Sequence, residues 1–499
     1  MLRSRPALVF WAATLAQALL WFVVPAIFYS APPDNLAQLL AVGHEFRFDA
    51  GVGPPLAYWL AEIAFRLGRL VGVYALAQLC VIVTYYCVFV LGRALVGAAH
   101  AAVAVLLMAG ISLFTVPSPD FGPPILAMAL WSIVLLHFWR AVALKRTRSW
   151  YVFGVAAALL LLTSSAALIL LGGIILFAAA TTRGHAALER SEPWIVTLSL
   201  TPFLFLHLLW IQGLGDALMP LLLKLREAQA ASANLSLWLK LLFALFLAHA
   251  GLIILVILAG GWPRVRTMPA PPLARRPIEP SAKTFVKLFA LAPALLATII
   301  AVIIGQTVPI GGAAPLLVLS GLGIVIAVGD SIALYHQRVL GFAWTGLLLV
   351  PALFVPLMIV FLPWTAGTDL QVAQPANAMG RFFAENFARR TGAPLAVITG
   401  DPRTAALVAL TAPSRPSVFF DDNPARSPWV TADDIRTKGA VVVWLAADTS
   451  PTLPPDIKAY FPDLVPEVPR TFERPVQGRQ PLLRIGWGVI RPGAVAPAH

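Results

Sequence analysis

The chain has 499 residues, of which 59% are apolar and 12% charged, and its mean hydropathy is +0.82. Soluble proteins carry charge at about twice that frequency, so the composition excludes a water-soluble globule as the main body. The formal net charge of +13 comes from Lys and Arg spread along the chain, without the basic domain that nucleic-acid binding requires. The two cysteines, Cys80 and Cys87, share one apolar run and predict no disulfide framework.

Apolar segments long enough to cross a bilayer, roughly 20 helical residues each, recur up to residue 362. The backbone must bond internally in lipid, and unbroken apolar runs favour helices over barrel strands. The first run follows Arg3 and Arg5 and ends at Tyr29, and its length predicts an uncleaved membrane helix rather than a signal peptide. We predict an all-α polytopic bundle of about eleven transmembrane helices. The further spans are 71–92, 98–116, 123–142, 150–165, 166–182, 193–211, 237–260, 285–305, 313–330 and 340–362.

The segment 150–182 is interrupted by a Thr-Ser-Ser run at 163–165, so it fits two short helices or one long tilted helix. Cytoplasmic loops carry an excess of Lys and Arg. With two helices, the basic cluster 264–287 lies on the same side as the N-terminal arginines, and we therefore prefer two. The N-terminus is then cytoplasmic, and the odd number of spans places the tail outside. Residues 261–280 are rich in Pro and Arg and predict an extended inside linker.

The composition changes after Trp364, where charged and turn residues return. A helical stretch at 377–390 precedes four short β-type runs, and this order predicts a small α/β domain of about 130 residues. The runs are 395–399, 417–420, 440–445 and 482–490. We thus expect a membrane domain at 1–365, with a first outer loop at 30–70, and a water-exposed domain at 366–499.

Acidic residues are scarce in the membrane part, so their positions are informative. Asp34 follows the first predicted helix, and Asp120 follows the third. The predicted topology places both at the outer face. Two carboxylates at one membrane–water boundary can act as a general base and as a second acid that orients it or binds a cation. The alternative is structural, because an Asp after Pro or Ser commonly caps the next helix.

The stretch 56–70 is amphipathic and too short to span. It predicts a helix along the outer membrane interface, with Tyr58 and Trp59 at headgroup depth. Glu62 within this stretch faces either a groove or water. The sequence has no Gly-rich loop between a strand and a helix, so it does not support nucleotide binding.

These features resemble the GT-C glycosyltransferases of the protein O-mannosyltransferase and aminoarabinose transferase group, the family 39 type. In that group an acid opens the first outer loop, a Pro-Pro-Leu motif follows, and a Pro-Asp motif starts the fourth span. Asp34, the run 54–59 (PPLAYW) and Asp120 hold these places here. The run 207–210 (HLLW) resembles a motif of a later span. The resemblance covers roughly 7–365, and the tail resembles periplasmic tails of bacterial members.

The resemblance implies an enzyme of the bacterial inner membrane, with a periplasmic C-terminal domain. It would transfer a sugar, with inversion, from a polyprenyl-phosphate donor to a lipid or cell-envelope glycan acceptor. Asp34 would deprotonate the acceptor hydroxyl, and Asp120 would organise the acceptor or a metal ion. Basic side chains would meet the charge of the leaving phosphate. The expected substrate-binding residues are His44, Arg47, Asp49, Pro55, Tyr58, Arg66, His207, Lys224 and Arg226.

The chain departs from the family pattern at three places. Asn35 stands where many members have Glu, 52–53 lack the His or Glu-Lys found before the proline motif, and 164–165 replace a Lys-Tyr pair. A bound divalent cation therefore stays open, its ligands are not identified, and the aminoarabinose specificity is not carried over. The alternatives are an inactive or structural membrane subunit and a lipid-linked sugar flippase or transporter. The predicted spans are nearly free of ionisable residues, which counts against a transporter.

Overall fold

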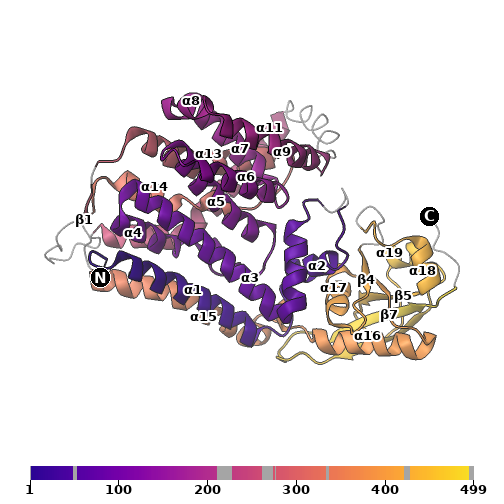
Figure 1. Ribbon diagram of the computed structural model, residues 1–499. Coiled ribbons are helices and arrows are strands. Elements are labelled where there is room, and N and C mark those ends of the chain that lie inside the picture. Colours follow the sequence, from indigo (N-terminus) through magenta and orange to yellow (C-terminus); the bar gives the residue numbers. More distant parts are fainter. Residues whose placement is uncertain are drawn as a thin grey trace. The chain divides into compact units, whose positions relative to one another are not determined.

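The computed structural model describes residues 2–48, 53–210, 228–260, 273–275, 277–332, 337–420 and 427–493. The chain forms two compact units. Unit 1 consists of Met1–Val23 and Tyr74–Leu353, and unit 2 consists of Val24–Val73 and Phe354–His499. Figure 1 shows helices through most of the chain and the strands of a sheet near its C-terminus. The linker predicted at 261–280 lies mostly outside the described residues.

Apolar helices make the chain a multi-pass membrane protein. Six helices in the described part are long and apolar enough to cross a bilayer, and two bent helix pairs bring the number to at most eight. The predicted total of about eleven stays a prediction. The six helices are α1 (Pro6–Phe28), α3 (Leu56–Val96), α5 (Pro123–Val142), α9 (Ser191–Trp210), α13 (Pro280–Ile303) and α15 (Gln337–Thr365).

The predicted interfacial stretch 56–70 and the span 71–92 are joined in α3. A kink separates the two segments within α3, because Gly68 and Arg69 have non-helical backbone angles. The boundary between the two units falls just after this kink, between Val73 and Tyr74. The segment before the kink therefore belongs to unit 2, and the long apolar segment after it belongs to unit 1.

The prediction of two helices at 150–182 is confirmed by α6 (Thr147–Leu161) and α7 (Ala166–Ala180). In the break between them, the Thr163 hydroxyl donates to the Leu159 carbonyl (2.7 Å), and the Ser164 hydroxyl accepts from the amide of Ala166 (3.3 Å). Short polar side chains that bond the backbone locally compete with the helical pattern. The interruption in the sequence therefore ends one helix and starts the next.

Several predicted spans are shorter or bent in the structure. The helix expected at 98–116 ends at Met108, and Gly110 follows it, where an added Cβ would lie 2.5 Å from the amide nitrogen of Leu252. α7 meets α8 at 99°, and the pair that α11 and α12 form bends by 52°. The remaining elements of unit 1 are α4 (Ala98–Met108), η1 (Ser112–Phe114), α8 (Thr182–Leu188), α11 (Ala228–Ala248), α12 (Ala250–Ala259), β1 (Leu273–Ala274), η2 (Pro315–Leu317), α14 (Ser320–Val328) and β2 (Ser331–Ile332).

Aromatic rings pack the interior of unit 1. The Phe177 ring lies near those of Phe138 and Phe285, with centroids 5.9 and 5.5 Å away, and the Phe289 ring is tilted against Phe285 at 4.9 Å. All four side chains are buried. Such edge-to-face and tilted pairs add to the dispersion energy of close packing. They join α5, α7 and α13 into one bundle.

Unit 2 contains a five-stranded mixed sheet in the order β4-β3-β5-β7-β6. Four of its strands confirm predicted β-type runs, and α16 confirms the predicted helix. The first three neighbours in this order pair parallel, and β7 pairs antiparallel with β5 and with β6. The elements are η3 (Gln371–Ala373), α16 (Ala376–Thr391), β3 (Val397–Gly400), α17 (Pro402–Thr411), β4 (Ser417–Phe420), α18 (Ala432–Lys438), β5 (Ala440–Leu445), α19 (Pro455–Tyr460), β6 (Pro466–Phe472) and β7 (Leu483–Ile490).

A helix from the first loop belongs to the core of this sheet domain. α2 (Asp34–Gly43) buries Ala37 and Ala41 in the same hydrophobic cluster as the sheet. Just before α2, the amides of Ser30 and Ala31 both donate to the Val372 carbonyl, at 2.8 and 3.1 Å. The first loop and the tail therefore fold together in one compact unit. The predicted domain boundary at residue 365 stays a prediction.

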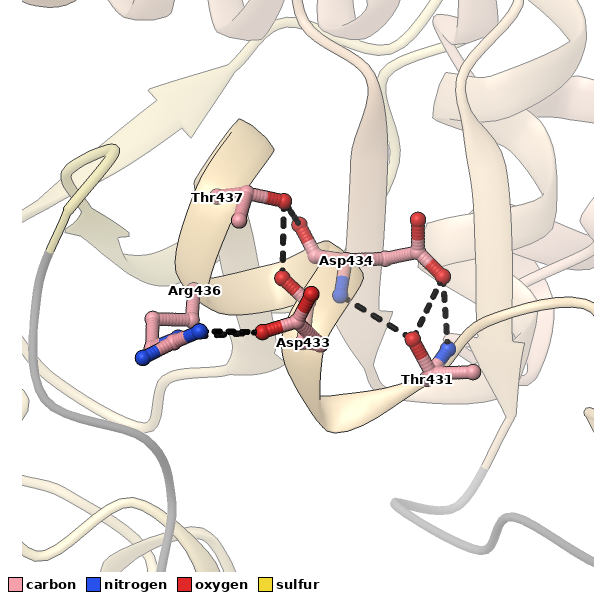
Figure 2. A network of polar contacts seen from close by, with 5 residues as sticks. All are labelled: Thr431, Asp433, Asp434, Arg436 and Thr437. Atoms are coloured by element: carbon pink, nitrogen blue, oxygen red, sulfur yellow. Dashed lines mark hydrogen bonds and ion pairs between the residues drawn. The ribbon is translucent and has the colours of Figure 1, made fainter.

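The sequence fixes the start of α18 with a capping box (Figure 2). The Thr431 amide donates to Asp434 Oδ2 (3.0 Å), and the Asp434 amide donates to Thr431 Oγ1 (3.1 Å). This reciprocal pair satisfies backbone donors that the first helical turn leaves unpaired. Arg436 forms an ion pair with Asp433, three residues earlier in the same helix, as Figure 2 shows.

Candidate functional site

Asp34, the predicted base, is the first residue of α2 in unit 2. Its Oδ2 lies 2.8 Å from Nε of Arg403 in α17, and Gln38 Nε2 donates to its Oδ1 at 3.4 Å. The N-cap of α2 is Pro33, so Asp34 is not the capping residue. Its side chain is 27% exposed. The carboxylate is thus oriented by two partners and remains open to solvent on one side.

Asp120, the predicted second acid, lies in unit 1 in the turn before α5. The N-cap of α5 is Gly122, so Asp120 does not have the capping role either. Its amide donates to the Pro117 carbonyl at 3.0 Å. The turn is held by the buried Ser118 hydroxyl, which donates to the Thr115 carbonyl (2.7 Å). The two candidate acids therefore belong to different units, and their convergence on one cavity stays a prediction.

Glu62 resolves a question that the sequence left open, because its side chain is buried rather than in water. Its Oε2 accepts from Nη2 of Arg415 at 2.8 Å, and its Oε1 accepts from Nε of Arg66 at 2.9 Å. His44 Nδ1 lies 3.3 Å from Oε1. The carboxylate is 2% exposed. It therefore joins two predicted substrate-binding residues, His44 and Arg66, to an arginine of the tail.

Three cation–ring contacts extend this cluster. The Arg415 and Arg69 guanidinium carbons lie 4.6 and 5.1 Å from the centroid of the buried Phe65 ring. The Arg66 guanidinium carbon lies 4.8 Å from the centroid of the Phe46 ring. Guanidinium groups are attracted to the negative face of aromatic rings. We call Glu62, Phe65, Arg66, Arg69 and Arg415 the arginine cluster.

The proline motif has a structural role at the start of α3. Pro55 is buried, and its carbonyl accepts from the amide of Trp59 at 3.1 Å. Trp59 Nε1 donates in turn to the Arg47 carbonyl at 3.3 Å. Tyr58 is half-buried, and its carbonyl lies 2.5 Å from where a Cβ on Gly43 would be. The motif thus packs the first turn of α3 against α2, near the arginine cluster.

His207 is fully buried in unit 1. Its Nδ1 lies 2.6 Å from the carbonyl of Leu161, the last residue of α6. Nδ1 therefore carries the proton and satisfies a carbonyl that the end of α6 leaves without a helical partner. Nε2 is buried and has no hydrogen-bond partner in the described part of the chain. His207 is thus not part of the cluster around Glu62.

Three predicted substrate-binding residues, Asp49, Lys224 and Arg226, lie outside the described residues. No group of three His, Cys, Asp or Glu side chains suited to a metal ion is present among the described residues. Sequence reasoning missed two tail residues, Arg403 and Arg415, which contact the acids of the first loop. In the sequence, only the positive charge of these two residues could have suggested a contact with the acids, because no motif surrounds them.

Comparisons with known proteins bear on the fold and on the family of part of the chain. The family of dolichyl-phosphate-mannose-protein mannosyltransferases matches residues 52–210. Two crystal structures of ArnT from Cupriavidus metallidurans are similar, one in the apo state (15% identity, TM-score 0.55) and one bound to undecaprenyl phosphate (14% identity, TM-score 0.54). Each comparison covers 97% of this chain and 97% of the other chain. No curated protein sequence matches the chain significantly.

The match at 52–210 begins just before the proline motif, includes Asp120, and ends with the HLLW run. The shared architecture extends beyond it over nearly the full length of both chains. The resemblance seen in the sequence is therefore confirmed: the chain has the fold of the GT-C glycosyltransferases, and its residues 52–210 match the dolichyl-phosphate-mannose-protein mannosyltransferase family.

Proposed function

We propose that the protein transfers a sugar from a polyprenyl-phosphate donor to a lipid or cell-envelope glycan acceptor at the periplasmic face of a bacterial inner membrane. The observation that carries the proposal is the match of residues 52–210 to a family named for a lipid-phosphate sugar donor. The likeness to ArnT supports it, because one of the ArnT structures is bound to undecaprenyl phosphate.

The shared side of the first loop and the tail supports the orientation. Ala37 and Ala41 pack into the core of the tail domain, so an even number of crossings separates the two segments. Loop charge favours a cytoplasmic N-terminus. The loop at 30–70, the tail and the site between their residues then face the periplasm, where polyprenyl-phosphate sugars and envelope acceptors meet.

The reaction proceeds by direct displacement. Asp34 takes the proton of the acceptor hydroxyl, and the oxygen attacks the anomeric carbon. The bond from that carbon to the phosphate oxygen breaks, and its electron pair leaves with the polyprenyl phosphate. Attack from the opposite face inverts the anomeric centre. Gln38 and Arg403 orient the Asp34 carboxylate, and Asp120 orients the acceptor.

Substrate contacts are assigned to the polar residues of both units. His44, Arg47, Tyr58 and Arg66 belong to the first loop and the start of α3. His207 has one buried ring nitrogen available. Asp49, Lys224 and Arg226 complete the proposed set, with Pro55 shaping the loop. A divalent cation is proposed only as an optional partner of Asp120.

The test is a transfer assay with the full chain reconstituted in liposomes. Undecaprenyl-phosphate sugars with different labelled hexoses and pentoses are supplied together with an envelope lipid extract as acceptor. The wild type should release undecaprenyl phosphate and label the extract, and Asp34→Asn should abolish both. Asp433→Asn, a matched change at an exposed tail position, should leave them unchanged.

Full transfer by Asp34→Asn would refute the role of Asp34. Wild-type protein that moves the labelled donor across the bilayer without cleaving it would instead identify a flippase. Lipid and glycan profiles of a deletion strain then identify the sugar and the acceptor, because the missing conjugate contains both.

A further inference from the structure

We propose that Arg66, Arg69 and Arg415 form a binding site for the phosphate ester of a membrane lipid, with Glu62 as the acid that positions Arg66 and Arg415. The assignment of this lipid to the polyprenyl-phosphate donor rests on the proposed function. The site adds to it a residue of the tail domain, Arg415, that holds the donor phosphate.

The first observation is an excess of positive charge. Three guanidinium groups share a single carboxylate among the described side chains of the arginine cluster, and both oxygens of Glu62 are already engaged. Arg415 Nη1 is buried and has no hydrogen-bond partner in the described part of the chain, and none of the described residues forms an ion pair with Arg69. The other nearby carboxylate, Glu45, interacts with Ser417, His44, Arg47 and Lys438 rather than with the three arginines of the cluster.

The charges are close enough to affect one another. Burial, together with the neighbouring Arg69 and Arg66, lowers the pKa of Arg415, although Glu62 opposes this. An uncompensated guanidinium in a partly buried site is costly. A phosphate at this site would receive charge-assisted hydrogen bonds from Arg415 Nη1, which lacks an acceptor among the described residues, and from the exposed Arg66 and Arg69. A bound anion would therefore stabilise the arginine cluster more than water does.

The second observation is the geometry around Phe65. Two guanidinium groups, from Arg69 and Arg415, each contact this one ring at about 5 Å. The ring thus contacts two planar guanidinium groups whose charges repel. Arginine forks match the oxygens of a phosphate better than lysine does. The arrangement is thus a pair of donors fixed in advance, with one wall made by an aromatic ring.

The third observation is backbone strain that coincides with the cluster. Phe46, Arg69 and Arg415 have φ angles of 48°, 54° and 50°, and Lys145 is the one other non-glycine residue with positive φ in the described part of the chain. Such conformations are strained for residues other than glycine and gather at functional sites. Two of the strained residues are the arginines on Phe65, and the third carries the ring beneath Arg66.

The fourth observation identifies the ligand as a lipid. Ile63 and Leu67 lie one helical turn apart on α3 and are 45% and 85% exposed, beside Arg66 and Arg69 in sequence. Exposed apolar side chains flanked by arginines are typical of helices that lie at the depth of lipid headgroups. A free phosphate ion would make no contact with Ile63 and Leu67. A lipid would place its hydrocarbon chain along these side chains and its phosphate at the arginines.

The test measures binding by native mass spectrometry of the full chain. The probes are undecaprenyl phosphate, undecaprenol (which lacks the phosphate) and phosphatidylglycerol. Arg69→Gln leaves the Glu62 ion pairs intact and should weaken undecaprenyl phosphate binding about tenfold, the effect of one charge-assisted hydrogen bond. Arg415→Gln should weaken it at least as much. Undecaprenol binding should not change, and Arg436→Gln, an exposed control, should bind like the wild type.

Undecaprenyl phosphate binding within twofold of the wild type in both variants, with hydrogen exchange showing a native unit 2, would overturn the site. Phosphatidylglycerol that binds equally well and is weakened equally would overturn its assignment to the donor. If the wild type binds as expected but transfers no sugar, the proposed function fails and the site stands. If Arg69→Gln and Arg415→Gln both transfer and bind like the wild type, the site fails and the function stands.

Discussion

Replacing Glu62 with Ala should destabilise the packing of the first loop against the tail domain by about 3 kcal/mol. Glu62→Ala deletes the acceptor of contacts from Arg415, Arg66 and His44, at 2.8, 2.9 and 3.3 Å. The side chains of Arg66 and His44 are 54% and 30% exposed, so each contact contributes less than about 1 kcal/mol. Arg415 is 16% exposed. Leaving a buried charge unpaired costs about 3–5 kcal/mol, and the remaining solvent contact of Arg415 favours the lower end.

Hydrogen-exchange mass spectrometry of the full chain in detergent measures this change locally. Amides of 56–67 and 402–416 should exchange roughly a hundredfold faster in Glu62→Ala, because about 1.4 kcal/mol corresponds to tenfold in the opening equilibrium. Glu62→Gln keeps the shape of the side chain and should show a smaller effect. The double variant Glu62→Leu/Arg415→Leu should exchange more slowly than Glu62→Ala, since it leaves no orphaned charge.

Exchange in Glu62→Ala within threefold of the wild type would refute this reasoning, because it would mean that Arg415 finds water or another acceptor at little cost. A double variant that opens as readily as the single variant would refute the orphaned-charge argument in particular. Asp433→Asn serves as the control, since it removes an exposed ion pair in the same unit.

Two further predictions concern unit 2. Gly43→Ala places a Cβ 2.5 Å from the Tyr58 carbonyl oxygen and should lower the free energy of unfolding by about 1–3 kcal/mol. Gly68→Ala, where no atom lies within 4 Å of the added Cβ, should melt like the wild type. Equal melting temperatures of the two variants would contradict this prediction. Lys438 and Thr431 lower the pKa of Asp434 to about 2, so its stabilisation is present above about pH 4 and is lost as the pH falls towards 2. Asp434→Asn should therefore cost about 1 kcal/mol at pH 7, the size of an N-cap contribution, and almost nothing near pH 2; a melting difference independent of pH would refute this.

Local patterns in the sequence predicted most of the elements. The runs that became β4 and β5 are rich in Val and Phe, and the Thr-Ser-Ser interruption separates α6 from α7. β6 (Pro466–Phe472) was missed, because two prolines and three charged or polar side chains break its apolar pattern. It is an edge strand in the sheet order, where a strand tolerates proline because one side needs no ladder bonds.

The sequence predicted only those parts of the candidate site whose residues are close to one another along the chain. Asp34, Arg66 and the proline motif stand close together in the sequence, and the structure places them in one unit. The ion pair between Glu62 and Arg415 joins residues 353 positions apart, and no periodicity or motif connects them. Burial of Glu62 was equally hidden, because a helix face that covers a tail domain looks the same in sequence as one that faces water.

The placement of α2 inside the core of the tail domain constrains how the protein is made. Ala37 and Ala41 emerge early during synthesis, yet the strands that cover them begin after residue 396. At about 5–20 residues per second, the first loop waits tens of seconds with an apolar face uncovered. Shortening the tail should therefore expose this loop to chaperones and proteases, even where every membrane helix has inserted correctly.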